Sequence, residues 1–154
     1  MDAAKGMLGE RRQLRLQRSY PVAPEKVWRA WTDARALAQW FRPDASFSVT
    51  VAEADARVGG RFHIVMVNGK GDAFDLSGVY REVVQFRKLV MTWGWREKQP
   101  GLESLVTVSL RPAGQGTELE LRHDQYVDIE NEPTHEQGWN GALEKLGQIL
   151  KEQT

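Results

Sequence analysis

Residues 134–152 read THEQGWNGALEKLGQILKE and predict the one long helix of the chain. Apolar side chains recur in this stretch at the i, i+3, i+4, i+7 spacing of an amphipathic helix. Four of them fall on one stripe when successive residues are turned by about 100°: Trp139, Leu143, Leu146 and Leu150. Nearly all of the chain from residue 46 to residue 123 predicts antiparallel strands, so this helix is the element available to cover a sheet. We therefore expect an α+β fold in which a curved antiparallel sheet wraps around this helix, with any functional site between the two.

The composition is that of an ordinary globular protein, and it excludes several classes of function. The 154 residues fit a single domain over residues 1–154, with a loose leader at about residues 1–9. A formal net charge of +0 gives no field to recruit nucleic acid, and no apolar run has the length of a membrane span, so we expect neither partner. The chain has 0 cysteines, which excludes disulfides and thiolate chemistry and favours the cytoplasm.

The N-terminal quarter predicts one strand and two short helices. Residues 11–20 alternate apolar and charged side chains, which is typical of a half-buried strand with its arginines on the solvent face. Pro24 suits the first turn of a helix over residues 25–31, because its missing N–H is not needed there. Asp33 then predicts an N-cap for a second helix over residues 34–40.

The middle of the chain predicts six strands joined by hairpins. Asn68 and Gly69 mark one hairpin turn, and proline and glycine mark later turns over residues 98–101 and 112–116. The expected strands are residues 46–52, 61–67, 73–84, 88–95, 103–110 and 117–123. Because one face of these strands is apolar and the other polar, we expect a single antiparallel sheet whose apolar face packs on the stripe of the C-terminal helix.

His123 is the polar residue most suggestive of chemistry. Its parity with Leu119 and Leu121 places it on the inner face of the sheet. A neutral imidazole there can anchor a ligand or act as an acid or base. Inward-facing histidines are more often hydrogen-bonded within the fold, and we favour that structural role. His63 has the opposite parity from its apolar neighbours and is expected to be exposed.

No metal site and no cofactor site are predicted. His135-Glu136 begins like a zinc-binding helix motif, but Trp139 stands where the second ligand would be. Four potential ligands lie near one another in the sequence without a repeated ligand spacing: His123, Asp124, Asp128 and His135. The glycine-rich turns join strand to strand, whereas a phosphate-binding loop opens a helix.

Seven short motifs lie between residues 23 and 139, within a resemblance that covers about residues 14–150. They are APEKVWRAWTD at 23–33, LAQWF at 37–41, GGRF at 59–62, GVYRE at 78–82, LVMTW at 89–93, GTELELRH at 116–123 and GW at 138–139. In this order they resemble the SRPBCC (START-like) superfamily, and most closely the branch named after the Hsp90 ATPase activator homologues. The resemblance implies a helix-grip fold with a cavity between sheet and helix. Arg42 departs from the pattern, since a small residue is expected after Trp40-Phe41, at the loop expected to form the cavity mouth.

Three glycines bear on whether that cavity exists. Gly78 is expected on the inner face of the sheet, and Gly138 and Gly141 lie within the C-terminal helix. A glycine inside a helix costs about 1 kcal/mol relative to alanine, so each has a local reason, either close packing or room for a ligand.

The resemblance favours a binding protein over an enzyme. Members of the superfamily bind lipids, hormones or polyketides, and some cyclise or hydroxylate bound substrates. Our first hypothesis is therefore a small hydrophobic ligand, lipid-like or aromatic, held in the cavity. The inward-facing residues expected to bind it are Phe62, Ile64, Met66, Phe74, Leu76, Tyr80, Met91, Trp93, Leu121, His123, Trp139 and Leu143.

Two alternatives stay open. One is a cyclase or hydrolase that uses His123 or Tyr80 as acid or base, although no second convincing catalytic group accompanies them. The other is a stress-related interaction module with an Hsp90 chaperone as its partner. The branch name refers to a domain of a larger eukaryotic co-chaperone, and nothing here resembles the separate Hsp90-binding domain of those proteins. A homodimer is an open hypothesis as well.

Overall fold

A computed structural model describes residues 12–95, 103–126 and 134–152. The elements, in chain order, are β1 (Arg12–Tyr20), α2 (Pro24–Thr32), α3 (Ala34–Trp40), β2 (Ser48–Ala54), β3 (Arg61–Val67), β4 (Ala73–Val84), β5 (Lys88–Trp95), β6 (Ser104–Ala113), β7 (Gly116–Tyr126) and α4 (His135–Glu152). The expected α+β order of one strand, two short helices, six strands and a long helix is confirmed. The predicted leader and the predicted turn at residues 98–101 lie outside the described residues.

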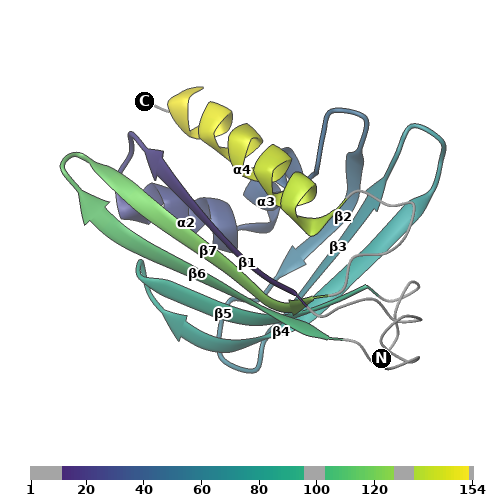
Figure 1. The fold of residues 1–154 in the computed structure, drawn as a ribbon, viewed down its shortest axis with the longest axis horizontal. Coiled ribbons are helices and arrows are strands. Elements are labelled where there is room, and N and C mark those ends of the chain that lie inside the picture. Colours follow the sequence, from purple (N-terminus) through teal and green to yellow (C-terminus); the bar gives the residue numbers. More distant parts are fainter. Residues whose placement is uncertain (1–11, 96–102, 127–133, 153–154) are drawn as a thin grey trace.

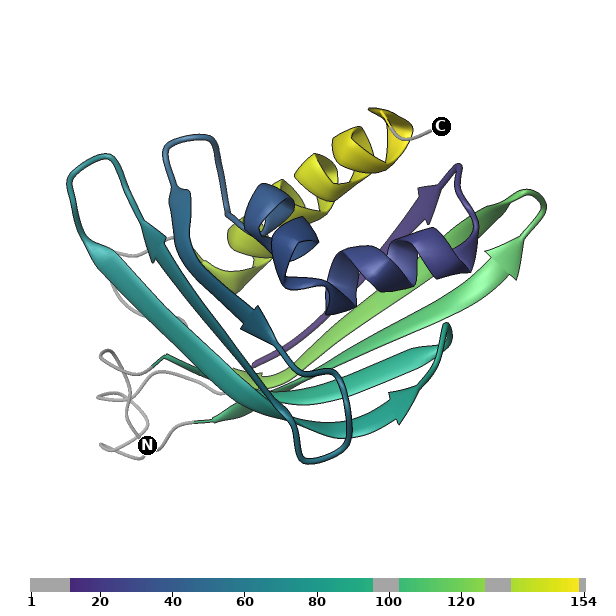
Figure 2. The same ribbon diagram turned by 180° about the vertical axis from the view of Figure 1, so that it is seen from behind.

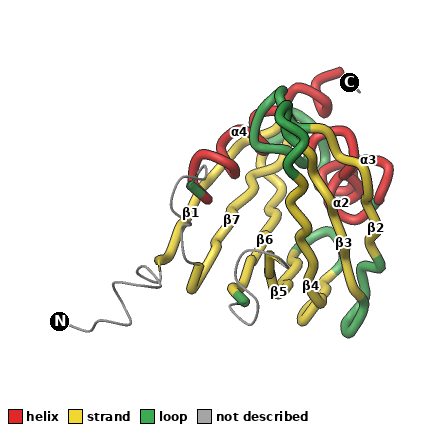
Figure 3. The backbone as a smooth tube through the Cα atoms, turned by 90° about the vertical axis from the view of Figure 1, so that its right-hand side faces the viewer, coloured by secondary structure: helices red, strands yellow, loops and turns green. Residues whose placement is uncertain are grey.

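The strands form one curved antiparallel sheet, and the helices lie on its concave side. The strand order is β1-β7-β6-β5-β4-β3-β2, and every neighbouring pair is antiparallel. α4 runs along the open side of the sheet, and α2 and α3 pack beside it (Figure 1, Figure 2). Seen from the side, the sheet bends around this helical layer (Figure 3). Within the described residues, no helix is both long enough and apolar enough to cross a membrane.

The hairpin between β6 and β7 is tighter than the sequence predicted. We expected a turn over residues 112–116, but Pro112 pairs with Thr117, Ala113 pairs with Gly116, and the turn is made by the two residues between them. β5 pairs with β6 only as far as Ser109. The N–H of Leu110 still donates to the backbone oxygen of Arg87 at 2.8 Å, and no further pairing with β5 follows. Pro112, which has no N–H, is therefore tolerated near the end of β6.

The helix ends follow simple capping chemistry. Asp33 begins α3 as predicted, because its carboxylate accepts the N–H groups of Arg35 at 2.8 Å and Ala36 at 3.3 Å. At α4 the hydroxyl of Thr134 accepts the N–H of Gln137, and the Gln137 side chain accepts the N–H of Thr134, both at 3.1 Å. This reciprocal pair is a capping box. It fixes where α4 begins, and the sequence Thr-x-x-Gln that encodes it was not used in our prediction.

The predicted stripe of α4 is buried against the sheet. Leu143, Leu146 and Leu150 are each 0% exposed, and Trp139 is 4% exposed. The hydroxyl of Tyr20 on β1 donates to the backbone oxygen of Leu143 at 3.0 Å, which ties the edge of the sheet to the middle of the helix. Removing such apolar surface from water is the main driving force for the docking of α4.

Gly141 is where α4 approaches the α3–β2 loop most closely. A Cβ added at Gly141 would lie 1.7 Å from the backbone oxygen of Pro43, so the helix needs glycine there. Gly138 is different, because its added Cβ would meet only the Cβ of Pro43 at 3.8 Å. Gly78 again marks close packing, with an added Cβ 1.9 Å from the backbone oxygen of Thr92. The sequence offered two reasons for these glycines, close packing or room for a ligand, and close packing explains Gly141 and Gly78.

Replacing Gly138 and Gly141, the two glycines of α4 compared above, by alanine should change the free energy of unfolding in opposite directions. Gly141→Ala forces α4 away from Pro43, and we expect the free energy of unfolding to fall by about 1–3 kcal/mol, the usual cost of overpacking. Gly138→Ala should raise it by up to about 1 kcal/mol, because alanine favours helix and meets no clash. Urea denaturation of the two variants measures both changes. Equal effects of the two substitutions would contradict the close approach at Gly141.

Candidate functional site

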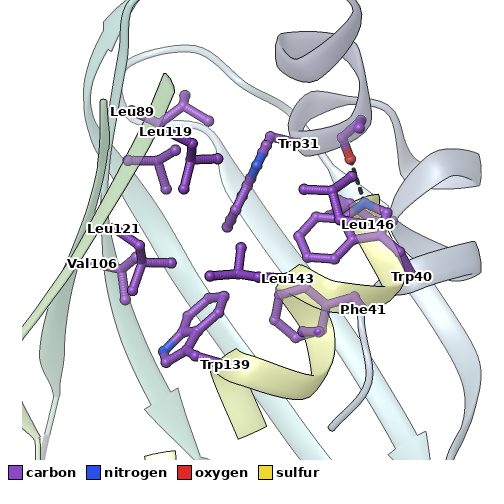
Figure 4. Close-up of a cluster of buried hydrophobic side chains, with 14 of the residues drawn as sticks. Trp31, Trp40, Phe41, Leu89, Val106, Leu119, Leu121, Trp139, Leu143 and Leu146 are labelled. Carbon is purple, nitrogen blue, oxygen red and sulfur yellow. Dashed lines mark hydrogen bonds between the residues drawn. The ribbon is translucent and has the colours of Figure 1, made fainter. Parts of the chain in front are cut away.

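Trp139 is the centre of an aromatic cluster that joins α4 to the short helices and to the sheet. Its ring stacks on Trp31 of α2 with centroids 5.9 Å apart, meets Phe41 edge-on at 5.8 Å, and lies 4.9 Å from Trp93 of β5. In Figure 4, Trp139 and Trp31 stand between the aliphatic side chains of the sheet and the helical layer. The C-terminal helix, the short helices and the sheet therefore share one aromatic core.

A chain of hydrogen bonds runs from this cluster through His123. The indole N–H of Trp139 donates to Nδ1 of His123 at 3.0 Å. Nε2 of His123 lies 2.7 Å from Oγ of Ser104, whose hydroxyl donates to the backbone oxygen of Trp93 at 3.2 Å. An indole nitrogen can only donate. Nδ1 is therefore the acceptor, the neutral imidazole carries its proton on Nε2, and His123 donates to Ser104.

The direction of these hydrogen bonds determines what chemistry His123 can perform. The imidazole is 0% exposed, and both of its nitrogens are occupied within the fold. Burial, with a smaller contribution from nearby His135, holds the pKa of His123 well below its usual range, so the ring stays neutral. Because Nε2 donates to Ser104 rather than accepting from it, the pair does not activate a serine nucleophile. The observed contacts of His123 therefore fit the structural role that the sequence favoured for it.

Tyr80, the other residue considered as an acid or base, is buried on β4. Burial, reinforced by the charge of Asp55, raises the pKa of its hydroxyl to about 12. A group with such a pKa is protonated and a poor proton donor near neutral pH. The interior between sheet and helix thus holds neutral polar groups.

An apolar pocket opens at the N-terminal end of α4, and we call it the mouth pocket. It has a cavity volume of about 100 Å³ and is partly open to the surface. Three segments converge on it: the α3–β2 loop, the ends of β3, β4 and β5, and the first turns of α4. The residues that line it are Phe41, Arg42, Pro43, Phe47, Met66, Phe74, Trp93, Trp95, Thr134, His135, Gly138, Trp139 and Ala142.

Of the twelve residues predicted to bind a ligand, the structure places four on the lining of the mouth pocket. These are Met66, Phe74, Trp93 and Trp139. The other eight belong to the buried core and do not line the mouth pocket: Phe62, Ile64, Leu76, Tyr80, Met91, Leu121, His123 and Leu143. Strand parity identifies residues that face inward, but it does not separate those that pack solidly from those that border an opening.

Sequence reasoning missed the α3–β2 loop as a wall of the mouth pocket. Phe41, Pro43 and Phe47 come from this loop and its helix end, and their contribution depends on tertiary packing against α4. A partial signal existed in Arg42, which departs from the family pattern and lines the mouth pocket. Trp95 continues the inward parity of β5 and was another available signal.

The histidines do not assemble a metal centre in the described part of the chain. His123 and His135 have ring centroids 5.0 Å apart, but the imidazole of His123 is occupied as described above. No group of three potential ligands there is placed to hold a metal ion. Asp128 lies outside the described residues. His63 lies on the outer face, where Nε2 is 2.9 Å from a carboxylate oxygen of Asp75.

The buried neutral His123 should make stability fall in mild acid. Its pKa is lower in the folded chain than in the unfolded chain, so below about pH 6.5 the unfolded chain takes up a proton that the folded chain does not. The free energy of unfolding should then fall with decreasing pH, by at most about 1.4 kcal/mol per pH unit from this residue.

Urea denaturation between about pH 7.5 and pH 5 measures this loss. His123→Gln removes the titrating group, so its free energy of unfolding should depend less steeply on pH, whatever its absolute value. The same slope in both proteins would show that His123 is not held neutral.

The curved sheet, the C-terminal helix that it grips and the pocket at one end of that helix define an α+β protein of the helix-grip class. The family model described as Activator of Hsp90 ATPase homolog 1-like protein matches residues 21–151. The chain belongs to this family, as its sequence motifs indicated. Among curated proteins, none matches the sequence.

Solved structures support the same assignment. The AHSA1 protein from Silicibacter pomeroyi is 32% identical, with a TM-score of 0.80 over 93% of this chain and 100% of that one. A protein from Chromobacterium violaceum is 28% identical, with a TM-score of 0.80 over 90% of this chain and 96% of that one. An Hsp90 activator from Plasmodium falciparum is 25% identical, with a TM-score of 0.68 over 90% of this chain and 96% of that one.

Proposed function

We propose that this protein binds a small, flat and largely apolar molecule in the mouth pocket. The observation that carries the proposal is the aromatic lining, to which Trp93, Trp95 and Trp139 contribute from the sheet and from α4. Pockets that bind small molecules are concave, mostly apolar and bordered by few polar groups. Aromatic walls favour a flat ring, because stacked and edge-on contacts add to simple burial.

The volume of the mouth pocket favours an aromatic molecule over a lipid chain. A closed apolar cavity of about 150 Å³ holds one benzene molecule. The mouth pocket, at about 100 Å³, is smaller than such a cavity but partly open, so it admits at most one ring, with the remainder of the molecule at the surface. A long acyl chain would have to displace the packed core around Leu143 and Leu121, both 0% exposed.

The polar chemistry of the interior supports binding rather than catalysis. His123 is fully hydrogen-bonded and neutral, and it donates to Ser104. Tyr80 keeps its proton near neutral pH. Neither group lines the mouth pocket, so a molecule held there is out of their reach. A carrier, a sensor or a ligand-dependent interaction module fits this arrangement.

Filling the mouth pocket with protein should remove binding. Gly138 lies on the lining with only Pro43 close to its added Cβ, so Gly138→Leu places a side chain in the cavity without a backbone clash. The matched control is Gln148→Leu, which adds leucine at an exposed position of the same helix. We expect naphthol (the β isomer) to bind the wild type and the control equally, and the filled variant at least about tenfold more weakly.

Isothermal titration calorimetry measures these affinities, and circular dichroism verifies that both variants fold. Binding that survives Gly138→Leu unchanged would place the probe elsewhere. An absence of binding to the wild type at millimolar naphthol would remove the proposal.

A second candidate function is interaction with an Hsp90 chaperone. It is favoured by membership of the family and by the similarity to the Hsp90 activator from Plasmodium falciparum. The test is the ATPase rate of the host organism's Hsp90 with and without this protein. Stimulation would support the chaperone role, and an unchanged rate at saturating protein would count against it. Repeating the assay with Gly138→Leu shows whether the mouth pocket takes part.

A further inference from the structure

The mouth pocket carries an excess of hydrogen-bond donors, and from this we infer the class of its ligand: a flat aromatic carboxylate whose charge is held by Arg42. This inference rests on the proposed function, since it names the chemistry of the molecule bound at the same site.

Arg42 is a cation at the rim of this apolar pocket, and within residues 12–95, 103–126 and 134–152 no carboxylate is paired with it. Its side chain is half-buried, and one guanidinium N–H donates to the backbone oxygen of Phe47 at 3.3 Å. A guanidinium has five N–H donors, so this bond leaves most of them unused by that partner. No carboxylate of the described residues pairs with Arg42, and the lining contains no aspartate or glutamate. A cation in such surroundings attracts an anion.

The indole of Trp93 supplies a second, independent observation. Trp93 is 5% exposed, lines the mouth pocket, and has a buried Nε1–H with no acceptor in the described structure. The other two indoles on the lining are both matched: Trp139 donates to His123 at 3.0 Å and Trp95 donates to Nε2 of His135 at 3.4 Å. A buried donor left without a partner is unfavourable, so an acceptor that reached this N–H after a small shift of the indole would gain affinity.

The side-chain acceptors that the lining offers, on Thr134 and His135, are already used, and so is the backbone oxygen of Phe47. Nε2 of His135 accepts from Trp95, the hydroxyl of Thr134 accepts the N–H of Gln137, and the backbone oxygen of Phe47 accepts from Arg42. A molecule that fits must therefore bring acceptors rather than donors.

The first turn of α4, whose helix dipole favours negative charge, borders the same pocket through Thr134 and His135.

A carboxylate matches this set of groups better than a phosphate. It has a single charge and two oxygens that accept several hydrogen bonds, and its plane suits a guanidinium. One guanidinium balances a single negative charge, and a neutral indole N–H can add only a hydrogen bond, whereas a phosphate dianion would require a second cation. The aromatic walls then select a flat ring as the body of the molecule.

The test compares naphthoate with naphthamide, which has the same shape and keeps a carbonyl but carries no charge. We expect the wild type to bind naphthoate about tenfold more tightly than naphthamide, because that ratio of affinities corresponds to the free energy of one charge-assisted hydrogen bond. Arg42→Gln keeps a donor for Phe47 and removes the charge, so the two probes should bind it equally. Arg35→Gln, which removes an exposed arginine from α3, should keep the wild-type preference.

The outcomes separate this inference from the proposed function. Equal binding of the two probes to the wild type, or a preference that survives Arg42→Gln, overturns the inference, while binding of neutral naphthol leaves the proposed function standing. If naphthol, naphthamide and naphthoate all fail to bind, both fall. If Gly138→Leu does not weaken naphthoate binding, the carboxylate is held elsewhere and the inference is wrong.

Discussion

The rest of the structure depends on how Trp139 packs in the aromatic cluster and bonds to His123. Its ring packs against Trp31, Phe41 and Trp93, and its N–H is held by His123. One side chain of α4 thus fastens the helix to the short helices, to the α3–β2 loop and to three strands through the chain of hydrogen bonds that includes Ser104. A large aromatic ring with one polar atom suits this position, because the ring is buried and its single donor is matched.

This arrangement confines the candidate site to one end of the molecule. Around Trp139 and beyond it along α4 the space is occupied by buried side chains such as Leu143, Leu146 and Leu119 (Figure 4). At the N-terminal end of α4 the mouth pocket opens, and Gly138 on its lining has no side chain to fill it. The mouth pocket is therefore a consequence of how the helix is anchored, and its polar groups come from the loop and helix ends that surround it.

The sequence predicted the architecture well because the architecture depends on periodicity. The stripe of α4, the cap at Asp33 and the inward parity of His123 all follow from local patterns, and the structure contains each of them. The lining of the pocket was harder to predict, because it depends on where the α3–β2 loop packs. That placement is fixed by the contact of Gly141 with Pro43, two residues far apart in the chain. The direction of hydrogen bonding at His123 likewise requires knowing that Trp139 is its partner.

Ligand binding in the mouth pocket is tested most directly by the proton–nitrogen correlation spectrum of the tryptophan indoles during a titration with naphthol. The chain has 6 tryptophans, of which Trp93, Trp95 and Trp139 line the mouth pocket. Trp28 packs against Phe86 in the β4–β5 turn, at the opposite end of β4 from the pocket residue Phe74, and serves as the internal reference. A ligand held in the mouth pocket should give saturable shifts of the three pocket indoles while the Trp28 resonance stays in place. Shifts centred on Trp28, or no shifts at all, would contradict it.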